Sequence, residues 1–574
     1  MRGGRPIFVL TALALGLVAA RLVALERTEG PALRARAARQ QHAEATIPAR
    51  RGDVLDCRGR VMAATVRKAS VFADPALVRD FAFDAAAVAE PLGLDEFALE
   101  RELLENTHRR FLWVKRRISA DEETAFKLAD ATHELTGFGL IYEPTRVYPL
   151  GPLAAQVLGF VNAEQRGAAG VEQAFDEQMR GAPGRRQSTV DVGRRRIAVK
   201  EGGYQPPVDG ASVVLTIDAH LQQRAESHVS RMVREFDAEW GVAVLLDPHT
   251  GEVLACAAAP SFDPRRPVPP GADAEQVEAA LELTRNRAIA DAYEPGSIFK
   301  PFIAAPAMQA GFARIDEAFA INGPTHVFGR RVIHDTHEYD TLTLAEIVSH
   351  SSNIGMGLIG ARCGNARLYE FVRRFGFGDP TGVRLPGEHA GLLRPLESWG
   401  NYSTQSIPIG QELAVTPLQV AAAFAVFCND GVLMRPRFVR GLVGPDGATV
   451  EDYSRPVAIR RVLEADVARE FRLRALVDTV NNGTGKRAQL DKWQVFGKTG
   501  TAQVAAPDGR GYIPRAYVGS FVAGAPAADP RLTVVVTLYR PNPSRAYYGG
   551  TVAAPTAAAI LADALEYLHV PPDR

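Results

Sequence analysis

The stretch Pro295-Gly296-Ser297-Ile298-Phe299-Lys300 contains the one Ser-x-x-Lys spacing in the chain, and an apolar run follows it. The Pro-Gly pair before this run predicts a helix over residues 297–311, with Ser297 in its first turn. Residues i and i+3 of a helix share a face, so the amine of Lys300 should reach the hydroxyl of Ser297. A lysine can activate a serine only when burial or a neighbouring cation lowers its pKa. The pair is therefore a candidate nucleophile and general base.

Two further motifs follow in order. Ser351-Ser352-Asn353 comes after a helical pattern and offers a hydroxyl that can relay a proton and an amide that can hold a substrate amide. Lys498-Thr499-Gly500-Thr501 lies in an expected strand, where alternation puts both threonines on one face and the glycine leaves room for a ligand backbone. A capping serine, a surface amide and an edge-strand lysine are the plain alternatives. Three motifs in this order favour an active site.

The composition is that of a globular protein without a basic excess. Of the 574 residues, 46% are hydrophobic and 23% charged, and Lys+Arg and Asp+Glu both total 66. These values argue against a disordered chain and against a nucleic-acid binder, which needs basic residues to neutralise phosphates. Four cysteines without a Cys-x-x-Cys pair are too few for a disulfide scaffold. At roughly 150 residues per domain, two to four domains are expected.

One segment near the N-terminus is apolar enough to span a membrane. Residues 6–25 are about twenty in number, enough at ~1.5 Å each for a bilayer core, with Arg21 able to reach the interface. A cleaved signal peptide is the alternative, because Val18-Ala19-Ala20 fits a cleavage site. Arginines on both sides leave the orientation open.

The rest of the chain divides into a smaller domain at 26–205 and a larger one at 206–574. Residues 26–50 predict a helix leaving the membrane, and residues 200–207 predict a linker. A turn at residues 247–251 joins two strand patterns into a hairpin. Strands are expected at 212–217, 241–246, 252–257, 494–503 and 532–538, and helices at 297–311, 341–350, 366–375, 415–428 and 553–568.

Some clusters imitate other kinds of site. His334, His337 and Glu338 have a metal-like spacing, but they lie in a polar stretch at 329–339 that we interpret as a solvated loop, so no metal is expected. Residues 481–486 lack the spacing of a phosphate-binding loop. No cofactor is expected. Apolar neighbours predict that three cysteines are small core residues: Cys256, Cys363 and Cys428.

The motifs resemble those of the penicillin-recognising serine acyltransferases, and within them the class B penicillin-binding proteins of the division type (FtsI-like) or its sporulation relatives (SpoVD-like). Cys57-Arg58 departs from the family's usual Arg-Asn and should affect packing of the pedestal. Gly410-Gln411-Glu412 replaces a glycine-rich run and should affect pocket shape. The resemblance runs nearly end to end, through residues 51–63, 143–161, 170–172, 293–297, 410–417 and 547–555.

This resemblance implies a multidomain α+β fold. It implies a cytoplasmic tail at 1–5, a single transmembrane anchor at 6–25, and a mixed α/β pedestal of the dimerisation type at 26–205. Residues 206–574 would form a transpeptidase domain, an antiparallel sheet flanked by helices. The protein would lie in the inner membrane, with its catalytic domain on the periplasmic side.

The resemblance also implies D,D-transpeptidation of peptidoglycan stem peptides that end in D-Ala-D-Ala. Ser297 would attack the carbonyl between the two D-alanines, with Lys300 as general base. Ser351 would pass a proton to the departing D-alanine, and Asn353 would hold the substrate backbone. The N–H groups of Ser297 and Thr501 would form the oxyanion hole.

The third motif would bind the terminal carboxylate. Lys498 would attract it and keep Lys300 deprotonated, and the hydroxyls of Thr499 and Thr501, beside Gly500, would bind it. β-Lactams would acylate the same serine. The implied partners are a membrane glycosyltransferase of the SEDS type (FtsW-like) and other division proteins at the septum.

Alternatives remain open from the motifs alone. An elongation-type or sporulation-type transpeptidase shares them, as do a D,D-carboxypeptidase and a serine β-lactamase. Residues 397–401 have the Glu-x-x-x-Asn pattern of a deacylating-water site. A catalytically silent division scaffold or a β-lactam sensor is the alternative from a different functional class.

Overall fold

The computed structural model describes residues 4–32, 42–190, 196–506 and 511–574. The chain divides into two compact units. The first comprises Met1–Arg51 and Arg180–Gly210, and the second comprises Gly52–Met179 and Ala211–Arg574.

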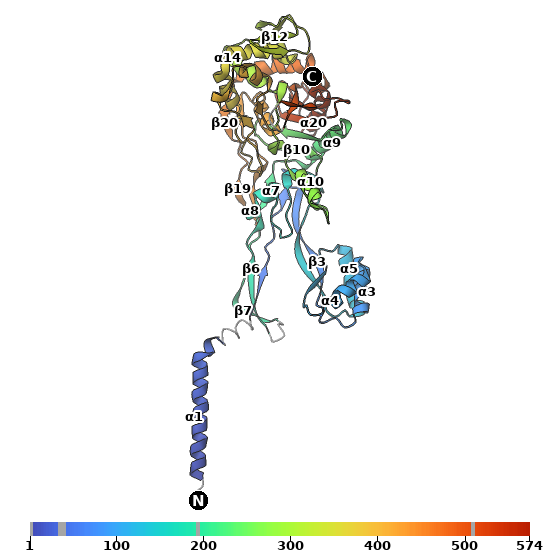
Figure 1. Ribbon diagram of the computed structural model, residues 1–574, viewed down its shortest axis with the longest axis vertical. Helices are drawn as coiled ribbons and strands as arrows, with labels where there is room; N and C mark the ends of the chain where they lie inside the picture. Colours follow the sequence, from blue (N-terminus) through green and yellow to red (C-terminus); the bar gives the residue numbers. More distant parts are fainter. Residues whose placement is uncertain (1–3, 33–41, 191–195, 507–510) are drawn as a thin grey trace. The chain divides into compact units, whose positions relative to one another are not determined.

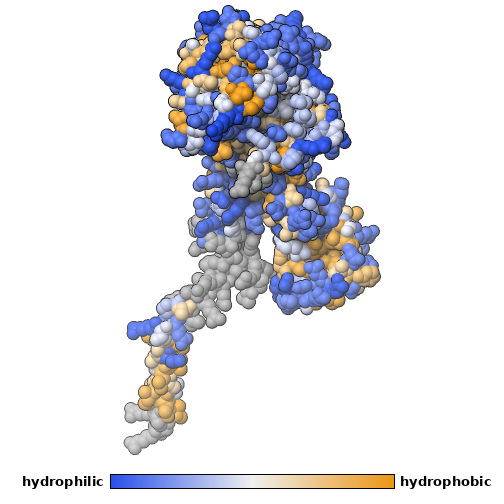
Figure 2. Space-filling model, turned by 45° about the horizontal axis from the view of Figure 1, so that its top comes forward, coloured by the Kyte–Doolittle hydropathy of each residue, from blue (hydrophilic) through white to orange (hydrophobic). Residues whose placement is uncertain are grey.

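The first unit contains an apolar helix and a small sheet. Helix α1 (Gly4–Thr28) includes the 22 residues Ile7–Thr28, which are long and apolar enough to cross a membrane. At 1.5 Å per residue they span about 33 Å, against ~30 Å for a bilayer core. The surface of this helix is largely orange in Figure 2. Strands β1 (His42–Ile47), β6 (Gly184–Val190) and β7 (Arg196–Gln205) form an antiparallel sheet in that order.

Two predictions in this unit are wrong. The expected helix at 26–50 ends at Thr28 as part of α1, and its residues 42–47 form β1; its residues 33–41 lie outside the described residues. The expected linker at 200–207 lies mostly in β7. Both segments are strands because each pairs with β6. Strand pairing between segments distant in the sequence overrides their local composition.

A small lobe of the second unit is built on two long antiparallel strands. β3 (Val61–Ala73) pairs with β5 (Phe138–Val147) on one edge and with β4 (Leu112–Lys115) on the other. Three helices pack their apolar faces against these strands (Figure 1): α3 (Phe81–Leu92), α4 (Glu96–Glu105) and α5 (Ala120–His133). Side chains of Asp80, Asp95 and Ser119 accept hydrogen bonds from the first turns of these helices and fix where each begins.

The lobe is joined to the rest of the unit through one seven-stranded sheet. The order is β19-β18-β8-β2-β3-β4, with β5 also on β3. β2 and β8 run parallel, and the neighbouring pairs are antiparallel. The strands not yet given are β2 (Val54–Leu55), β8 (Ser212–Leu215), β18 (Val439–Val443) and β19 (Thr449–Asp452), and short helices beside them are α6 (Ala155–Leu158), α7 (Gly170–Ala174) and α8 (Asp176–Arg180).

A five-stranded antiparallel sheet forms the centre of the larger domain. Its order is β10 (Val253–Ala259), β9 (Trp240–Leu246), β23 (Leu532–Tyr539), β22 (Tyr512–Ala525) and β21 (Phe496–Ala505). Side chains alternate between two cores: Val534 and Val536 pack in one, and Val535 packs in the other. Strand β21 is an edge strand, so no further strand of the sheet pairs with its outer side.

Helices cover both faces of this sheet (Figure 1). α9 (Ala219–Glu235) and α20 (Ala554–Tyr567) contribute to one core, and α12 (Pro301–Gln309), α14 (Asn353–Arg374) and α16 (Pro417–Ala425) contribute to the other. The α+β fold with an antiparallel sheet flanked by helices is therefore confirmed. The remaining helices include α10 (Ala274–Thr284), α11 (Arg287–Ala290), α13 (Leu344–Ser349), α15 (Ser403–Ser406), α17 (Ala465–Phe471), α18 (Val477–Asn481) and α19 (Gly549–Val552).

The predicted hairpin is confirmed as β9–β10. The strands predicted at 494–503 and 532–538 are confirmed as β21 and β23. Strand β22 has no counterpart among the predictions. The predicted helix at 366–375 is only the second half of α14, which is kinked at Gly364 (φ 73°). The three cysteines expected in the core are buried and form no disulfide: Cys256, Cys363 and Cys428.

At the Cys57-Arg58 departure, the contacts of Arg58 are with residues of the 206–574 segment, and the expected effect on packing of the pedestal stays a prediction. Arg58 forms an ion pair with Asp218 (Nε–Oδ2 2.7 Å), and the carboxylate of Asp218 also caps α9. The Arg58 guanidinium lies 4.8 Å from the ring centroid of Tyr567 in α20.

A buried ion pair joins the lobe to its neighbouring elements. Arg146 of β5 donates to Glu172 of α7 (2.7 Å), to the carbonyl of Gly52 (2.7 Å) and to the hydroxyl of Thr65 (3.1 Å). The side chains of Arg146 and Glu172 are 1% and 0% exposed. Charges so fully desolvated must be paired, because an unpaired buried ion is very costly.

We predict that Glu172→Ala lowers the free energy of unfolding by about 3–5 kcal/mol, because it leaves the Arg146 guanidinium buried without its carboxylate. Urea denaturation followed by tryptophan fluorescence measures this. The control is Arg367→Ala, which breaks the exposed pair with Glu370 and should cost less than about 1 kcal/mol. Equal losses in both variants would contradict the prediction.

Candidate active site

The serine of the first motif lies on a tight turn held from two sides. Residues Gly296–Phe299 form a 3-10 turn, η1, immediately before α12, and the Ser297 side chain is half-buried. Gly296 has φ 58°, and a Cβ there would meet the Thr501 carbonyl at 2.8 Å. On the other side, the N–H of Gly296 donates to the carbonyl of Gly410 (3.1 Å). Close backbone approach therefore requires glycine at both positions.

The lysine of the first motif is completely buried beneath this turn. The Lys300 Nζ donates to the Ser351 carbonyl (2.5 Å), the Ser351 hydroxyl (3.1 Å) and the Asn353 amide oxygen (2.8 Å). The first two motifs are thus brought together, although some 50 residues separate them. Within the described part of the chain, the Ser297 hydroxyl has no hydrogen-bond partner, so the direct bond expected from Lys300 to it is not formed in the free protein.

The second motif is fixed by a carboxylate that the sequence analysis missed. Asp335 accepts hydrogen bonds from the Ser352 hydroxyl (2.5 Å) and from the backbone N–H groups of Asn353 (2.5 Å) and Ile354 (3.1 Å). Ser352 caps α14, and Ser351 before it has φ 64°, a conformation uncommon for a residue with a side chain. The carboxylate holds the motif at the helix N-terminus, where negative charge is favourable.

The position of Asp335 corrects the interpretation of residues 329–339 as a solvated loop. Residues Arg331–His334 form strand β13, which pairs with β12 (Thr325–Phe328), and Asp335 follows this hairpin. No local sequence signal identifies such a carboxylate. Asp335 reaches the motif only through the tertiary fold, and its position after a polar hairpin does not by itself indicate this contact.

The third motif lies on edge strand β21. Thr499 and Thr501 line the hollow described below, while Lys498 is 0% exposed and donates to the Thr499 carbonyl (3.1 Å). The Thr499 hydroxyl is 2.6 Å from that of Thr484, and the Gly549 N–H donates to the Thr501 hydroxyl (3.1 Å). Both of these partners were missed by the sequence analysis.

The packing at Gly500 differs from the sequence-based interpretation. A Cβ at Gly500 would lie 2.4 Å from the Ser520 hydroxyl and 3.0 Å from Ile298 Cβ. The absent side chain therefore lets β21 approach η1 and β22, and the space it leaves faces the protein interior. That glycine sets the distance between the first and third motifs.

Burial shifts the pKa of both amines. It lowers the pKa of Lys300 to about 7, partly opposed by the negative charge of Asp335. Burial and the positive charge of Lys300 together hold the pKa of Lys498 well below its ordinary value. Two buried cations repel each other, so the state with both amines protonated is disfavoured. Burial therefore accounts for the lowered pKa of Lys300.

Side chains of all three motifs border one open hollow of about 740 Å³, a size within the usual range for ligand sites. Ser297, Ser351 and Asn353 line it together with the two threonines of β21. One wall is a stack of three tyrosines, with ring centroids 4.1 and 4.4 Å apart: Tyr517, Tyr547 and Tyr548. No sequence pattern marks this wall as part of the site, nor the basic residues Lys486 and Arg487 that also line the hollow.

Gly410, Gln411 and Glu412 were expected to affect the shape of the pocket, but they are not part of the lining of the hollow. Glu412 instead accepts hydrogen bonds from Arg394 (2.6 Å) and Ser403 (2.8 Å), and its N–H donates to Glu294. These residues therefore contact the turn η1 and Glu294 just before it, and they do not form the wall of the hollow.

Two other sequence patterns lie outside the hollow. Glu397 and Asn401 are both exposed and do not line it. His334 Nδ1 lies 3.1 Å from the Thr325 hydroxyl across the β12–β13 hairpin. Across the described ranges of the chain, no three His, Cys, Asp or Glu side chains are grouped so that they could hold a metal ion.

Comparison with known proteins places these features in context. Residues 241–562 match the family model of the penicillin-binding protein transpeptidase domain, and residues 46–215 match that of the penicillin-binding protein dimerisation domain. The chain is 32% identical to the probable peptidoglycan D,D-transpeptidase PbpC of Pseudomonas aeruginosa, over 99% of this chain and 95% of that protein. It is 30% identical to the peptidoglycan D,D-transpeptidase FtsI of Escherichia coli, over 91% and 84%.

A solved structure is also similar. The crystal structure of penicillin-binding protein 3 from Mycobacterium tuberculosis, complexed with aztreonam, has a TM-score of 0.69 at 27% sequence identity. The similarity covers 92% of this chain and 98% of that one.

We predict that Gly500→Ala destabilises the protein by about 1–3 kcal/mol, because the added methyl group overlaps Ser520 and the nucleophile turn. Chemical denaturation measures the change. Gly400→Ala is the matched control, since a Cβ there has nothing within 4 Å. Unchanged stability of the Gly500 variant would show that the strand and the turn are less tightly apposed than described.

Proposed function

Because the chain belongs to the penicillin-binding protein transpeptidase family and is a serine-type peptidoglycan D,D-transpeptidase, we propose that Ser297 is the nucleophile that the stem peptide acylates. The observation that carries the assignment is the fully buried amine of Lys300. This amine is hydrogen-bonded to Ser351 and Asn353, and both of these residues line the hollow together with Ser297. β-Lactams acylate the same hydroxyl.

In the first step, neutral Lys300 takes the proton of the Ser297 hydroxyl as the serine oxygen attacks the carbonyl between the two D-alanines. The C–N bond then breaks, and the departing amine receives a proton through Ser351, whose hydroxyl is 3.1 Å from Lys300 Nζ. D-Alanine leaves, and the acyl group remains as an ester on Ser297. The amine of a second stem peptide attacks this ester, the C–O bond to Ser297 breaks, and Lys300 carries a proton from the attacking amine to the released serine oxygen.

The substrate is held by the remaining motif residues. Edge strand β21 offers backbone groups to an extended peptide, and Asn353 binds the substrate backbone from the opposite side. The hydroxyls of Thr499 and Thr501, beside Gly500, bind the terminal carboxylate, which Lys498 attracts. The N–H groups of Ser297 and Thr501 form the oxyanion hole, worth ~3–4 kcal/mol per donor in comparable sites.

The remaining assignments extend beyond the catalytic domain. Helix α1 serves as an uncleaved anchor in the inner membrane, with residues 1–5 in the cytoplasm, and its length supports this. The pedestal occupies residues 26–205, and the catalytic domain residues 206–574 lie in the periplasm. Similarity to FtsI supports a septal role beside an FtsW-like glycosyltransferase of the SEDS type and other division proteins. Co-purification from crosslinked membranes tests that partnership, and consistent absence of such a glycosyltransferase would contradict it.

Incubation of the full-length protein with benzylpenicillin should give one persistent covalent adduct in intact-mass analysis, because Ser297 forms a stable acyl-enzyme. Ser297→Ala should abolish the adduct, and the exposed-site variant Ser454→Ala should retain it. An adduct in the Ser297→Ala protein would refute the assignment. Loss of the adduct within seconds as penicilloate accumulates would identify a β-lactamase instead.

The rate of acylation should depend on pH through Lys300. The amine is active when neutral, and with a pKa of about 7 its neutral fraction rises roughly tenfold between pH 6 and pH 8. The acylation rate, measured by stopped flow with a fluorescent penicillin, should rise with this fraction and then level off. The surface variant Lys492→Gln is the control and should show the same pH dependence. A rate that is flat from pH 6 to 8 would exclude Lys300 as the base.

A further inference from the structure

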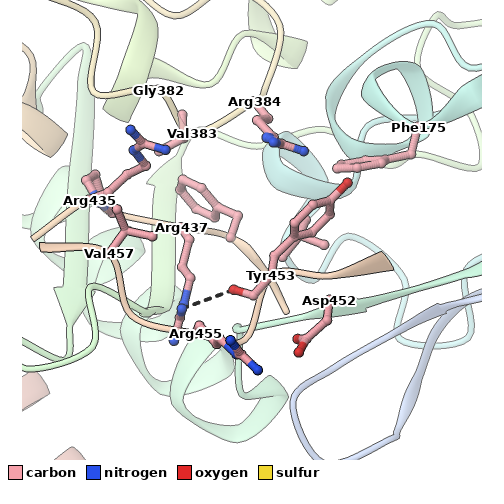
Figure 3. A pocket seen from close by; sticks show the side chains of 13 residues that line it. Phe175, Gly382, Val383, Arg384, Arg435, Arg437, Asp452, Tyr453, Arg455 and Val457 are labelled. Atoms are coloured by element: carbon pink, nitrogen blue, oxygen red, sulfur yellow. Dashed lines mark hydrogen bonds between the residues drawn. The ribbon is translucent and has the colours of Figure 1, made fainter. Parts of the chain in front are cut away.

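A second hollow lies elsewhere in the second unit, and none of its residues takes part in the proposed chemistry. It measures about 220 Å³ and is lined by segments 382–384, 435–439 and 452–457 together with Phe175 of the pedestal. Phe175, Val383 and Phe438 give it a buried apolar lining, and Figure 3 labels the first two among the side chains around it. We call it the basic hollow, because four arginines and one carboxylate line it.

Three of these arginines form no ion pair with any residue that the structure describes. Within the described ranges, no ion pair or side-chain hydrogen bond involves Arg384, Arg435 or Arg455, and all three are exposed. Arg437 differs, because it donates to Glu252 (3.1 Å) and to the Tyr453 carbonyl (3.0 Å), the contact dashed in Figure 3. The Arg384 guanidinium lies 4.4 Å from the ring centroid of Tyr453. The four arginines therefore outnumber Asp452, the one carboxylate in the lining, and leave the hollow with an excess of positive charge.

The basic hollow continues along an open strand edge. Strand β20 (Ala458–Arg461) is exposed throughout and pairs with β17 (Val432–Met434) in a two-stranded sheet. Val457, just before β20, lines the basic hollow, and Ile459 lines a second depression of about 60 Å³ that shares Pro436 with it. Val457 and Ile459 are two residues apart and so share a face of the chain; they are 42% and 38% exposed.

We propose that this surface binds an extended, acidic segment of a partner protein, with apolar side chains at alternate positions. Its carboxylates pair with Arg384, Arg435 and Arg455, and its backbone lies along the edge of β20 that faces away from β17. Its apolar side chains enter the two depressions beside Val457 and Ile459. The basic hollow is smaller than the ~300–1,000 Å³ of small-molecule sites, which suits single side chains better than a cofactor.

The test uses the full-length protein in detergent and a fluorescein-labelled peptide in which Glu alternates with Phe and Val. Fluorescence anisotropy should show saturable binding that weakens at least about tenfold in Arg435→Gln/Arg455→Gln, because charge-assisted bonds are lost. The matched control, Arg266→Gln/Arg531→Gln, removes two exposed arginines elsewhere and should bind like the parent protein. Replacing Phe and Val of the peptide by Ser should weaken binding comparably.

Benzylpenicillin acylation should be the same in all these proteins, which shows that each is folded and separates this proposal from the assignment of Ser297. No saturable binding, or equal binding by the two double variants, would overturn the proposal. Displacement of the peptide by a soluble anionic muropeptide at lower concentration would also overturn it, and would assign the surface to the cell-wall polymer instead.

Discussion

The buried amine of Lys300 is the feature on which the arrangement of the site depends. Removing an ammonium group from water costs several kcal/mol, and burial therefore drives the amine towards its neutral form. The neutral amine still needs hydrogen-bond partners, and three oxygens of Ser351 and Asn353 supply them. That requirement fixes the turn before α14, and Asp335 holds the turn from the other side.

A second constraint is the contact between the nucleophile turn and the edge of the sheet. Glycines at 296, 410 and 500 allow three backbone segments to approach so closely that a Cβ at any of them would overlap a neighbour. The position of Ser297 relative to Thr501 is thus set by backbone packing, which is stiffer than side-chain contacts. A peptide lying along β21 would present its carbonyl to a serine so placed, as the proposed acyl transfer requires.

The parts of the site predictable from sequence are those encoded by local spacing. Ser297 with Lys300, the Ser-x-Asn motif and Lys498–Thr501 are short patterns in expected helices and strands, and the hairpin β9–β10 has a clear turn. Asp335, Thr484 and Gly549 reach the site through tertiary contacts, and no local pattern marks them. Strands β1 and β7 were mistaken for a helix and a linker for the same reason: β6 determines their structure by pairing with them.

The central claim, that Lys300 is a buried amine poised to accept a proton near neutral pH, can be measured directly. The chain has eight lysines, so a spectrum of protein labelled with [ε-13C]lysine is simple enough to assign with a Lys300→Arg variant. Titration by NMR should show one amine, absent from the variant, with a pKa of about 7. Titration of that resonance near the ordinary value of ~10.4 would contradict the account.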